Sequence, residues 1–184
     1  MGQLEGKVAI VTGGGSGIGK AIARAFAQER CAVVIAGRTA ARLEAAAQEL
    51  SQVGGPVVPI VADVTDEAQV KALFRQTLSH FGRLDIVVNN AALFDRVPLE
   101  EMSTDLWNRV IATNLTAPFL CTREAFPIMK AAGGGRIINI GSISAQRTRV
   151  DHAAYTSSKF GLWGLTQAAA LEGRPYGIAV SCLH

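Results

Sequence analysis

Short hydrophobic runs alternate along this chain with longer segments in which apolar residues recur at helical spacing. Each run is almost wholly apolar, which is typical of a strand covered on both faces of a sheet. The six runs are residues 7–12, 32–37, 57–61, 84–89, 136–141 and 178–183. Between them, apolar series with a four-residue repeat predict amphipathic helices. The two clearest series are Ile18, Ile22 and Phe26, and Val70, Phe74 and Leu78.

This alternation of strands and helices predicts right-handed crossovers and a doubly wound α/β fold around a parallel sheet. We expect the strand order 3-2-1-4-5-6, and 184 residues suit a single domain over residues 1–184. Pro59 in the third run supports this order. A proline has no N–H, so it is tolerated in an edge strand but removes a ladder bond from a central one.

Composition narrows the class of protein. Hydrophobic residues make up 49% of the chain and charged residues 18%, as in globular proteins. Apolar runs are shorter than the roughly 18 residues of a membrane span, so we expect no membrane association. The net charge of +3 comes from scattered residues and argues against a nucleic acid partner. Cys31, Cys121 and Cys182 lack metal or disulfide spacing, which predicts reduced thiols, no metal and a cytoplasmic protein without a signal peptide.

The first hydrophobic run is followed by a glycine cluster, TGGGSGIG at residues 12–19, and then by a helical segment. Glycines allow a tight turn and let a pyrophosphate approach the N–H groups at the start of the helix. The spacing Gly13-x-x-x-Gly17-x-Gly19 differs from G-x-G-x-x-G. A plain turn is the alternative, but the position between a first strand and a helix favours dinucleotide binding.

The end of the second run indicates which dinucleotide binds. A carboxylate at that position would hold the adenosine ribose hydroxyls and repel a 2′-phosphate. This chain has Gly37 and Arg38 there instead, and a guanidinium can pair with the phosphate. We therefore expect NADP rather than NAD, the alternative being that Arg38 is a solvated residue at the start of a helix.

Further polar motifs follow the glycine cluster in a fixed order. The full set is TGGGSGIG at 12–19, DV at 63–64, NNAA at 89–92, Asn114, Ser142 and YTSSK at 155–159. With these motifs the whole chain resembles the short-chain dehydrogenase/reductase family. The resemblance implies a Rossmann fold and hydride transfer between a nicotinamide dinucleotide and a small-molecule carbonyl or alcohol.

The resemblance also assigns functional residues. The catalytic group that it implies is Asn114, Ser142, Tyr155 and Lys159. Together with Arg38, the implied cofactor-binding residues are Gly13, Gly15, Ser16, Gly17, Ile18, Gly19, Asp63, Val64, Asn89, Ala91, Tyr155 and Lys159. In this assignment Asp63 and Val64 contact adenine, Asn89 shapes the floor beneath the cofactor, and Lys159 binds the nicotinamide ribose.

Tyr155 and Lys159 are four positions apart, so on a helix their side chains lie on one face. A carbonyl that accepts a hydride also needs a proton, and a nearby ammonium favours the phenolate form of a phenol, most strongly in a water-poor pocket. Such pairs are common on helices. Ser142 favours the chemical interpretation. It directly follows the fifth run, at the strand end where open α/β sheets bind ligands, and its hydroxyl can orient a substrate oxygen. His152 is interpreted as a residue at the rim of the pocket.

Pro118 follows Asn114 at a distance of four residues. Because a proline has no N–H to give to the carbonyl four residues before it, we expect the helix to be disturbed at Asn114. Our hypothesis is that the freed carbonyl holds a water that links Lys159 to solvent in a proton relay, as the resemblance also implies.

Two features depart from the family pattern. Ala92 stands where the family usually has glycine. The sequence ends at His184, where family members commonly continue with a Pro-Gly turn, a substrate-covering segment and a last strand. We therefore expect the sheet to lack that last strand, the chain being either a fragment or a product without its substrate-covering segment.

The resulting functional prediction is an NADP-dependent carbonyl reductase or alcohol dehydrogenase. A reductase of acyl-carrier-linked 3-ketones is an alternative, which a basic patch beside the substrate site would favour. A non-catalytic dinucleotide-binding or oligomer-forming protein is another. The family resemblance also implies a homodimer or homotetramer, and the apolar segment 160–173 suits a contact between helices of two subunits or a core.

Overall fold

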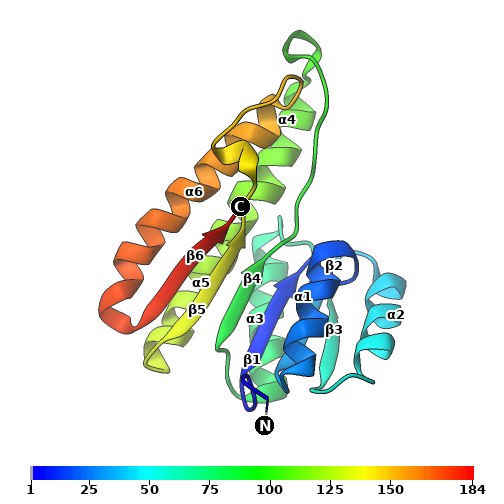
Figure 1. The fold of residues 1–184 in the computed structure, drawn as a ribbon, viewed down its shortest axis with the longest axis vertical. Coiled ribbons are helices and arrows are strands. Elements are labelled where there is room, and N and C mark those ends of the chain that lie inside the picture. The colour runs from blue at the N-terminus through cyan, green and yellow to red at the C-terminus, as the bar shows by residue number, and fades with distance from the viewer. Residues whose placement is uncertain (1) are drawn as a thin grey trace.

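The computed structural model describes residues 2–184 and contains a parallel sheet with helices on both faces (Figure 1). The six strands lie in the predicted order β3-β2-β1-β4-β5-β6. The strands are β1 (Val8–Thr12), β2 (Ala32–Gly37), β3 (Val57–Val61), β4 (Ile86–Asn89), β5 (Gly135–Ile140) and β6 (Ile178–Leu183). The helices are α1 (Gly17–Gln28), α2 (Ala40–Leu50), α3 (Glu67–Phe81), α4 (Thr104–Ile111), α5 (Ala117–Ala131) and α6 (Ala153–Gly173). Shorter helical turns are η1 (Leu99–Glu101), η2 (Ala112–Thr116), η3 (Ile143–Ala145) and η4 (Arg174–Tyr176).

The hydrophobic runs predicted the strands to within two residues at either end. The largest difference is in β4, which begins at Ile86 rather than at residue 84. Pro59 lies opposite Ile35 in β3, which is an edge strand, so the prediction from its missing N–H is confirmed. At the other side of the sheet β6 pairs only with β5 and forms the second edge within residues 2–184.

Helices α1 and α2 cover one face of the sheet, and α3, α5 and α6 cover the other (Figure 1). Two clusters of buried side chains result, one on each face. Large members on the α1 face are Val11, Ile35, Leu43 and Leu50. Large members on the α3 face are Ile10, Leu73, Phe74, Met129 and Ile137. Because strand side chains alternate between faces, the apolar runs supply both clusters at once.

One expectation for α1 is wrong. The four-residue series predicted Ile18 on the buried face, but its side chain is 65% exposed. The fully buried residues of this helix are Gly19, Ala23 and Ala27, one position further along the chain. These small residues bring α1 close to the sheet, and Ile18 is left at the end of the helix beside the glycine turn.

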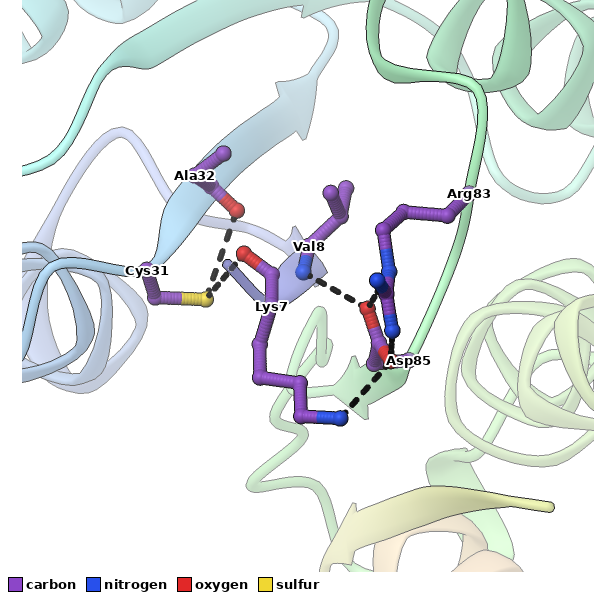
Figure 2. Close-up of polar contacts among 6 residues, drawn as sticks. All are labelled: Lys7, Val8, Cys31, Ala32, Arg83 and Asp85. Atoms are coloured by element: carbon purple, nitrogen blue, oxygen red, sulfur yellow. Dashed lines mark hydrogen bonds and ion pairs between the residues drawn. The ribbon is translucent and has the colours of Figure 1, made fainter. Parts of the chain in front are cut away.

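The amino ends of β1 and β4 are tied together by Asp85 (Figure 2). Its carboxylate accepts the backbone N–H of Val8 at 2.9 Å. It also accepts two hydrogen bonds from Arg83, at 2.8 and 2.7 Å, and lies 3.4 Å from Nζ of Lys7. One carboxylate therefore joins segments that are 77 residues apart in the chain.

Burial alone would raise the pKa of Asp85, but the bonds from Arg83 and Val8 and the charges of Arg83 and Lys7 outweigh it and lower that pKa. Beside this cluster, the thiol of Cys31 donates to the carbonyl of Lys7 at 3.3 Å (Figure 2). Burial, and then the charge of Asp85, raise the pKa of Cys31 to about 12. The thiol is therefore protonated at neutral pH and serves as a packing group.

None of the helices within residues 2–184 is both long and apolar enough to cross a membrane.

Candidate active site

A cavity of about 380 Å³ opens at the carboxyl ends of β1, β2, β3 and β4, where open α/β sheets bind ligands. Predicted cofactor residues that line it are Gly13, Gly15, Ser16, Ile18, Arg38, Asp63, Val64 and Ala91. Predicted cofactor residues that do not line it are Gly17, Gly19, Asn89, Tyr155 and Lys159. Within residues 2–184 no group of three or more histidine, cysteine or acidic side chains is placed to hold a metal ion.

The turn after β1 depends on glycine at two positions. Gly13 has φ +66°, in the left-handed region, and a β-carbon there would lie 2.8 Å from Nδ2 of Asn90. A β-carbon on Gly19 would lie 2.4 Å from the same nitrogen and from the carbonyl oxygen of Gly13. A larger residue at either position would displace Asn90, whose Nδ2 donates to the carbonyl of Thr12 at 2.8 Å.

Helix α1 begins without a side-chain cap. Ser16 is its N-cap residue and makes no capping hydrogen bond, whereas Asp66 caps α3 and Ser103 caps α4. The first N–H groups of α1 are thus available to an anionic group at the cavity. An uncapped helix start behind a tight glycine turn fits the pyrophosphate of a dinucleotide.

Two arginines lie on the side of the cavity formed by β2 and α2. Arg38 and Arg42 are exposed and line the cavity, and neither makes an ion pair within residues 2–184. The carboxylate on the lining is Asp63, whose Oδ1 accepts the N–H and the hydroxyl of Thr65 at 2.9 and 2.7 Å. The electrostatic character beside the end of β2 is therefore positive.

Asn89 lies away from the cavity, although it was expected at the cofactor floor. It is 4% exposed, and its Nδ2 donates to Oδ1 of Asn139 at 2.8 Å, on the face of the sheet covered by α6. Asn139 in turn donates to Oγ1 of Thr166 at 2.9 Å. Asn90, the next residue, lines the cavity instead, because neighbouring residues at the end of a strand point to opposite faces.

Tyr155 and Lys159 lie one turn apart on α6, as predicted. Lys159 is 3% exposed, its Nζ donates to the carbonyl of Ile140 at 2.7 Å, and Nζ lies 5.6 Å from the centre of the Tyr155 ring. Burial lowers the pKa of Lys159 to about 8, and the neighbouring Cys182 opposes this. The structure therefore places a buried ammonium beside the phenol, one helical turn away.

Ser142 follows β5 directly and begins η3. Its Oγ accepts the N–H of Ser144 at 3.1 Å, and the residue is half-buried. The ring of His184 lies against it, with Nδ1 at 3.0 Å from the carbonyl of Ser142, and packs on Trp163 with ring centres 5.3 Å apart. The hydroxyl is thus fixed by its own short turn at the carboxyl end of the sheet.

Asn114 lies in η2, which is a π-helical turn immediately before α5. The expected disturbance of the helix is present there. Helices α4, η2 and α5 form one continuous helical segment, and the π-helical turn lies just before Pro118, whose missing N–H interrupts the α-helical hydrogen-bond ladder. The Asn114 amide accepts the N–H of Leu93 at 2.7 Å and donates to the Leu93 carbonyl at 2.8 Å and to Oγ of Ser158 at 3.1 Å. Its side chain therefore clamps the loop after β4 to helix α6.

His152 is 8% exposed and does not lie at the rim of a pocket, contrary to our interpretation from the sequence. Its Nδ1 contacts the carbonyl of Asp95, and its ring packs on Phe94 with centres 4.6 Å apart. Burial follows because the segment before α6 forms a parallel bridge with Val97 of the loop after β4.

Some residues of the site were not found from the sequence. Arg42, Thr65, Asn90 and Thr113 all line the cavity. Arg42 is one helical turn after Arg38, and that spacing could have indicated it. Ser158 lies within the YTSSK motif and joins Asn114 to the main chain of Tyr155, its Oγ donating to the Tyr155 carbonyl at 2.6 Å.

The parallel doubly wound sheet, with a glycine turn and an uncapped helix start at the carboxyl ends of its strands, defines a dinucleotide-binding α/β protein. Comparison with known proteins gives the family, because residues 7–184 match the model of short chain dehydrogenases. The chain belongs to this family and is an oxidoreductase that binds a nicotinamide dinucleotide.

Curated relatives cover almost all of the chain. An uncharacterized oxidoreductase, YxjF of Bacillus subtilis (strain 168), is 44% identical over 180 residues, which are 98% of this chain and 70% of that protein. A D-threitol dehydrogenase of Mycolicibacterium smegmatis is 38% identical over 98% of this chain and 70% of its own length. A hexahydro-1H-indene-carboxyl-CoA reductase of Mycobacterium tuberculosis is 40% identical over 99% of this chain and 71% of its own.

Solved structures agree with the fold. A short chain dehydrogenase from Mycobacterium smegmatis superposes with a TM-score of 0.95 at 34% identity, over 99% of this chain and 77% of that one.

Proposed function

We propose that this protein is a cytoplasmic, NADP(H)-dependent oxidoreductase that interconverts a small-molecule alcohol and a carbonyl compound, with Tyr155 as general acid and base. The observation that carries the proposal is the buried Lys159, whose ammonium is held by the Ile140 carbonyl one helical turn from Tyr155. Placing a charge there costs stability, and such costs are typical of catalytic sites.

Bound nicotinamide would supply or take up the hydride. In the direction of reduction, Tyr155 gives its phenolic proton to the substrate oxygen, and the hydroxyl of Ser142 donates a hydrogen bond to the same oxygen. Lys159 stabilises the phenolate that remains. Asn114 holds η2 and the loop after β4 beside α6, and its main-chain carbonyl holds the water that reprotonates the site.

The preference for NADP rests on Arg38 and Arg42. Both guanidinium groups line the cavity beside the end of β2 and are free of ion pairs within the described residues, so both can bind a 2′-phosphate. A carboxylate that would repel this phosphate does not stand in that stretch of the sequence.

The substrate class is a secondary alcohol or its ketone. One relative is named for a four-carbon polyol and another for a carboxyl-CoA compound, so polyols and acyl thioesters are the two groups to test first. The thioester alternative corresponds to the acyl-carrier-linked 3-ketones, which carry a long anionic arm.

We further propose a homodimer or homotetramer that uses α5 and α6. Three aromatic side chains on these helices are exposed: Phe119 (43%), Phe160 (46%) and Trp163 (40%). Apolar residues exposed in this way on neighbouring helices suit an isologous contact between copies.

The proposal is tested by paired fluorescence titrations with NADPH and NADH on the wild type and on Arg38→Gln. We expect tighter binding of NADPH, and a loss of roughly tenfold or more in NADPH affinity with unchanged NADH affinity in Arg38→Gln, because a charge-assisted bond to the phosphate is lost. Arg109→Gln is the matched control, since Arg109 is exposed on α4 and pairs with Asp105.

Two results would overturn parts of the proposal. Equal affinity for both dinucleotides would remove the NADP preference and leave the oxidoreductase assignment. Binding of neither dinucleotide would show that this chain does not form the site. A turnover assay with D-threitol and a 3-ketoacyl thioester then decides between the two substrate classes, and absence of turnover with bound NADPH favours a non-catalytic binding protein.

A further inference from the structure

Helix α6, which carries Tyr155 and Lys159, is capped in an unusual way. Its N-cap residue His152 makes no capping hydrogen bond. Instead, Oδ1 of Asp95 accepts the backbone N–H of Tyr155 at 2.8 Å, from a position 60 residues earlier in the chain. Helices α3 and α4 are capped by residues immediately before them, Asp66 and Ser103. A distant cap fixes this helix relative to the loop that provides it.

The loop with Asp95 is itself held at several points. The Asn114 amide binds both the N–H and the carbonyl of Leu93, and the N–H of Val97 donates to the carbonyl of Asp151 at 2.8 Å. The carbonyl of Asp95 contacts Nδ1 of His152. The loop is therefore joined to η2 at Leu93, and to the segment before α6 at Asp95 and Val97.

The main chain of Tyr155 is held at both of its polar groups. Asp95 accepts its N–H, and Oγ of Ser158 donates to its carbonyl while accepting from the Asn114 amide. The Phe94 ring packs against the Tyr155 ring with centres 5.0 Å apart. Together these contacts fix where the phenol stands relative to the end of β4.

Asp95 is enclosed at this junction, and one of its two carboxylate oxygens makes the bond to Tyr155. It is 3% exposed, and its second carboxylate oxygen, Oδ2, is buried without a hydrogen-bond partner in the described residues.

We propose that Asp95 is a positioning residue for the reaction: by anchoring the first turn of α6 to the loop after β4, it sets the place of the Tyr155 hydroxyl. This inference rests on the proposed role of Tyr155 as general acid and base. Small displacements of a reacting group lower rates steeply, so loss of the anchor affects turnover far more than binding.

The test compares Asp95→Ala, Asp95→Asn and Asp66→Ala. We expect Asp95→Ala to lower kcat by about ten- to hundredfold with KM and NADPH affinity within about twofold. Asp95→Asn retains an acceptor for the Tyr155 N–H and recovers most of kcat. Asp66→Ala removes a cap of the same chemistry from α3, so it lowers the melting temperature and leaves kcat, measured at saturating cofactor, unchanged.

Hydrogen exchange of the Tyr155 amide gives a second readout that needs no substrate. It should accelerate in Asp95→Ala and stay slow in Asp95→Asn. If Asp95→Ala does not fold, Asp95→Glu replaces it, because the carboxylate is kept but moved by one methylene, and kcat should still fall.

The outcomes separate this inference from the proposed function. Wild-type protein that binds NADPH but turns over no substrate refutes the catalytic role of Tyr155, whereas the exchange data still decide whether Asp95 anchors it. Unchanged Tyr155 exchange in Asp95→Ala, or wild-type kcat with accelerated exchange, overturns the positioning role. A fall in kcat in Asp95→Asn as large as in Asp95→Ala also overturns it.

Discussion

The two ends of the parallel strands hold charged groups in different surroundings. At the amino ends, Asp85 accepts bonds from Val8 and Arg83 and lies beside Lys7 (Figure 2), and these groups lower its pKa. At the carboxyl ends, the ammonium of Lys159 is buried with a carbonyl as its hydrogen-bond partner, and burial lowers its pKa to about 8. The charge at the amino ends is stabilised by the fold, whereas the charge at the carboxyl ends is destabilised by it.

This difference separates structural from functional polar groups. A compensated carboxylate that joins two strands contributes to stability. The charge of Lys159 is incompletely compensated, it lies beside a phenol, and Asp95 in the same region has an unpaired carboxylate oxygen. Polar groups that cost stability in this way are typical of functional sites.

The largest effect should follow from removing the phenolic hydroxyl at the carboxyl ends of the strands. Tyr155→Phe keeps the ring that packs on Phe94 and deletes the proton donor. We expect kcat to fall by roughly 10²- to 10⁴-fold, the usual contribution of general acid–base catalysis. NADPH affinity, measured by fluorescence titration, should change little. A kcat within tenfold of the wild type would assign the proton transfer to another group.

Lys159→Met should stabilise the cofactor-free protein at pH 7, by up to about 3 kcal/mol, because a pKa lowered from 10.5 to about 8 measures the cost of the buried charge. Below pH 8, Lys159 of the folded wild type keeps its proton, so the wild type is destabilised by the full free energy of burying this charge. As pH rises from about 8 towards 10.5, Lys159 loses its proton in the folded state before it does so in the unfolded state. The free energy of unfolding of the wild type therefore rises, and its difference from that of Lys159→Met decreases.

Urea unfolding of both proteins from pH 7 to pH 10 measures this effect. Lys71→Met is the control, since Lys71 is 52% exposed and pairs with Glu67 on the surface of α3. An advantage of Lys159→Met that stays constant across this range would show that the stabilisation comes from packing rather than from charge.

Asp85→Asn should destabilise the protein at pH 7 by about 1–2 kcal/mol, because bonds from charged donors weaken while the N–H of Val8 keeps an acceptor. The pKa of Asp85 is lowered in the folded state, so its contribution is present above the ordinary carboxyl pKa and is lost as pH falls through the folded value. The free energies of unfolding of Asp85→Asn and of the wild type should therefore become similar at low pH.

Thermal or urea unfolding at pH 7 and at about pH 2–3 tests the convergence expected from this linkage. Asp105→Asn is the control, because Asp105 is 79% exposed and its pair with Arg109 spans 3.5 Å on the surface of α4. A difference between Asp85→Asn and wild type that persists undiminished in acid would contradict the electrostatic explanation.

The smallest effect should come from Lys7→Met at the amino ends. Lys7 is 48% exposed and lies 3.4 Å from Asp85, and ion pairs of this kind contribute less than about 1 kcal/mol. The loss of stability in Lys7→Met should disappear at about 1 M salt, because salt screens the attraction between exposed charges. A salt-independent loss above this range would mean that the lysine stem packs on the strand end.

The fold was predicted well from the sequence because its signal is local. Apolar runs mark strands buried on both faces, their alternation with helical segments predicts a doubly wound sheet, and Pro59 fits the edge position of β3 in the expected strand order. The glycine turn and the pair of Tyr155 and Lys159 were found for the same reason, since each lies within a few residues of chain.

Features that depend on a side chain's direction or on a distant partner could not be predicted from the sequence. Asn89 and Asn90 are adjacent, yet one residue of displacement at the end of β4 sends their side chains to opposite faces. Ile18 fitted a helical repeat but is exposed in the first turn of α1, where the neighbouring Gly19 takes the buried position. The bond from Tyr155 to Asp95 spans 60 residues and has no local pattern that predicts it.

The hydrogen bond between Val8 and Asp85 also has a consequence for folding of the chain during its synthesis. Strand β1 lies between β2 and β4, and its second partner is synthesised about 77 residues after it. At roughly 5–20 residues per second, the nascent chain waits about 4–15 s with one side of β1 unpaired. Strand β3 ends at Val61 and β4 begins at Ile86, so only in the last part of this interval can the half-sheet β3-β2-β1 exist, with a hydrophobic edge at β1 that stays open until β4 pairs with it.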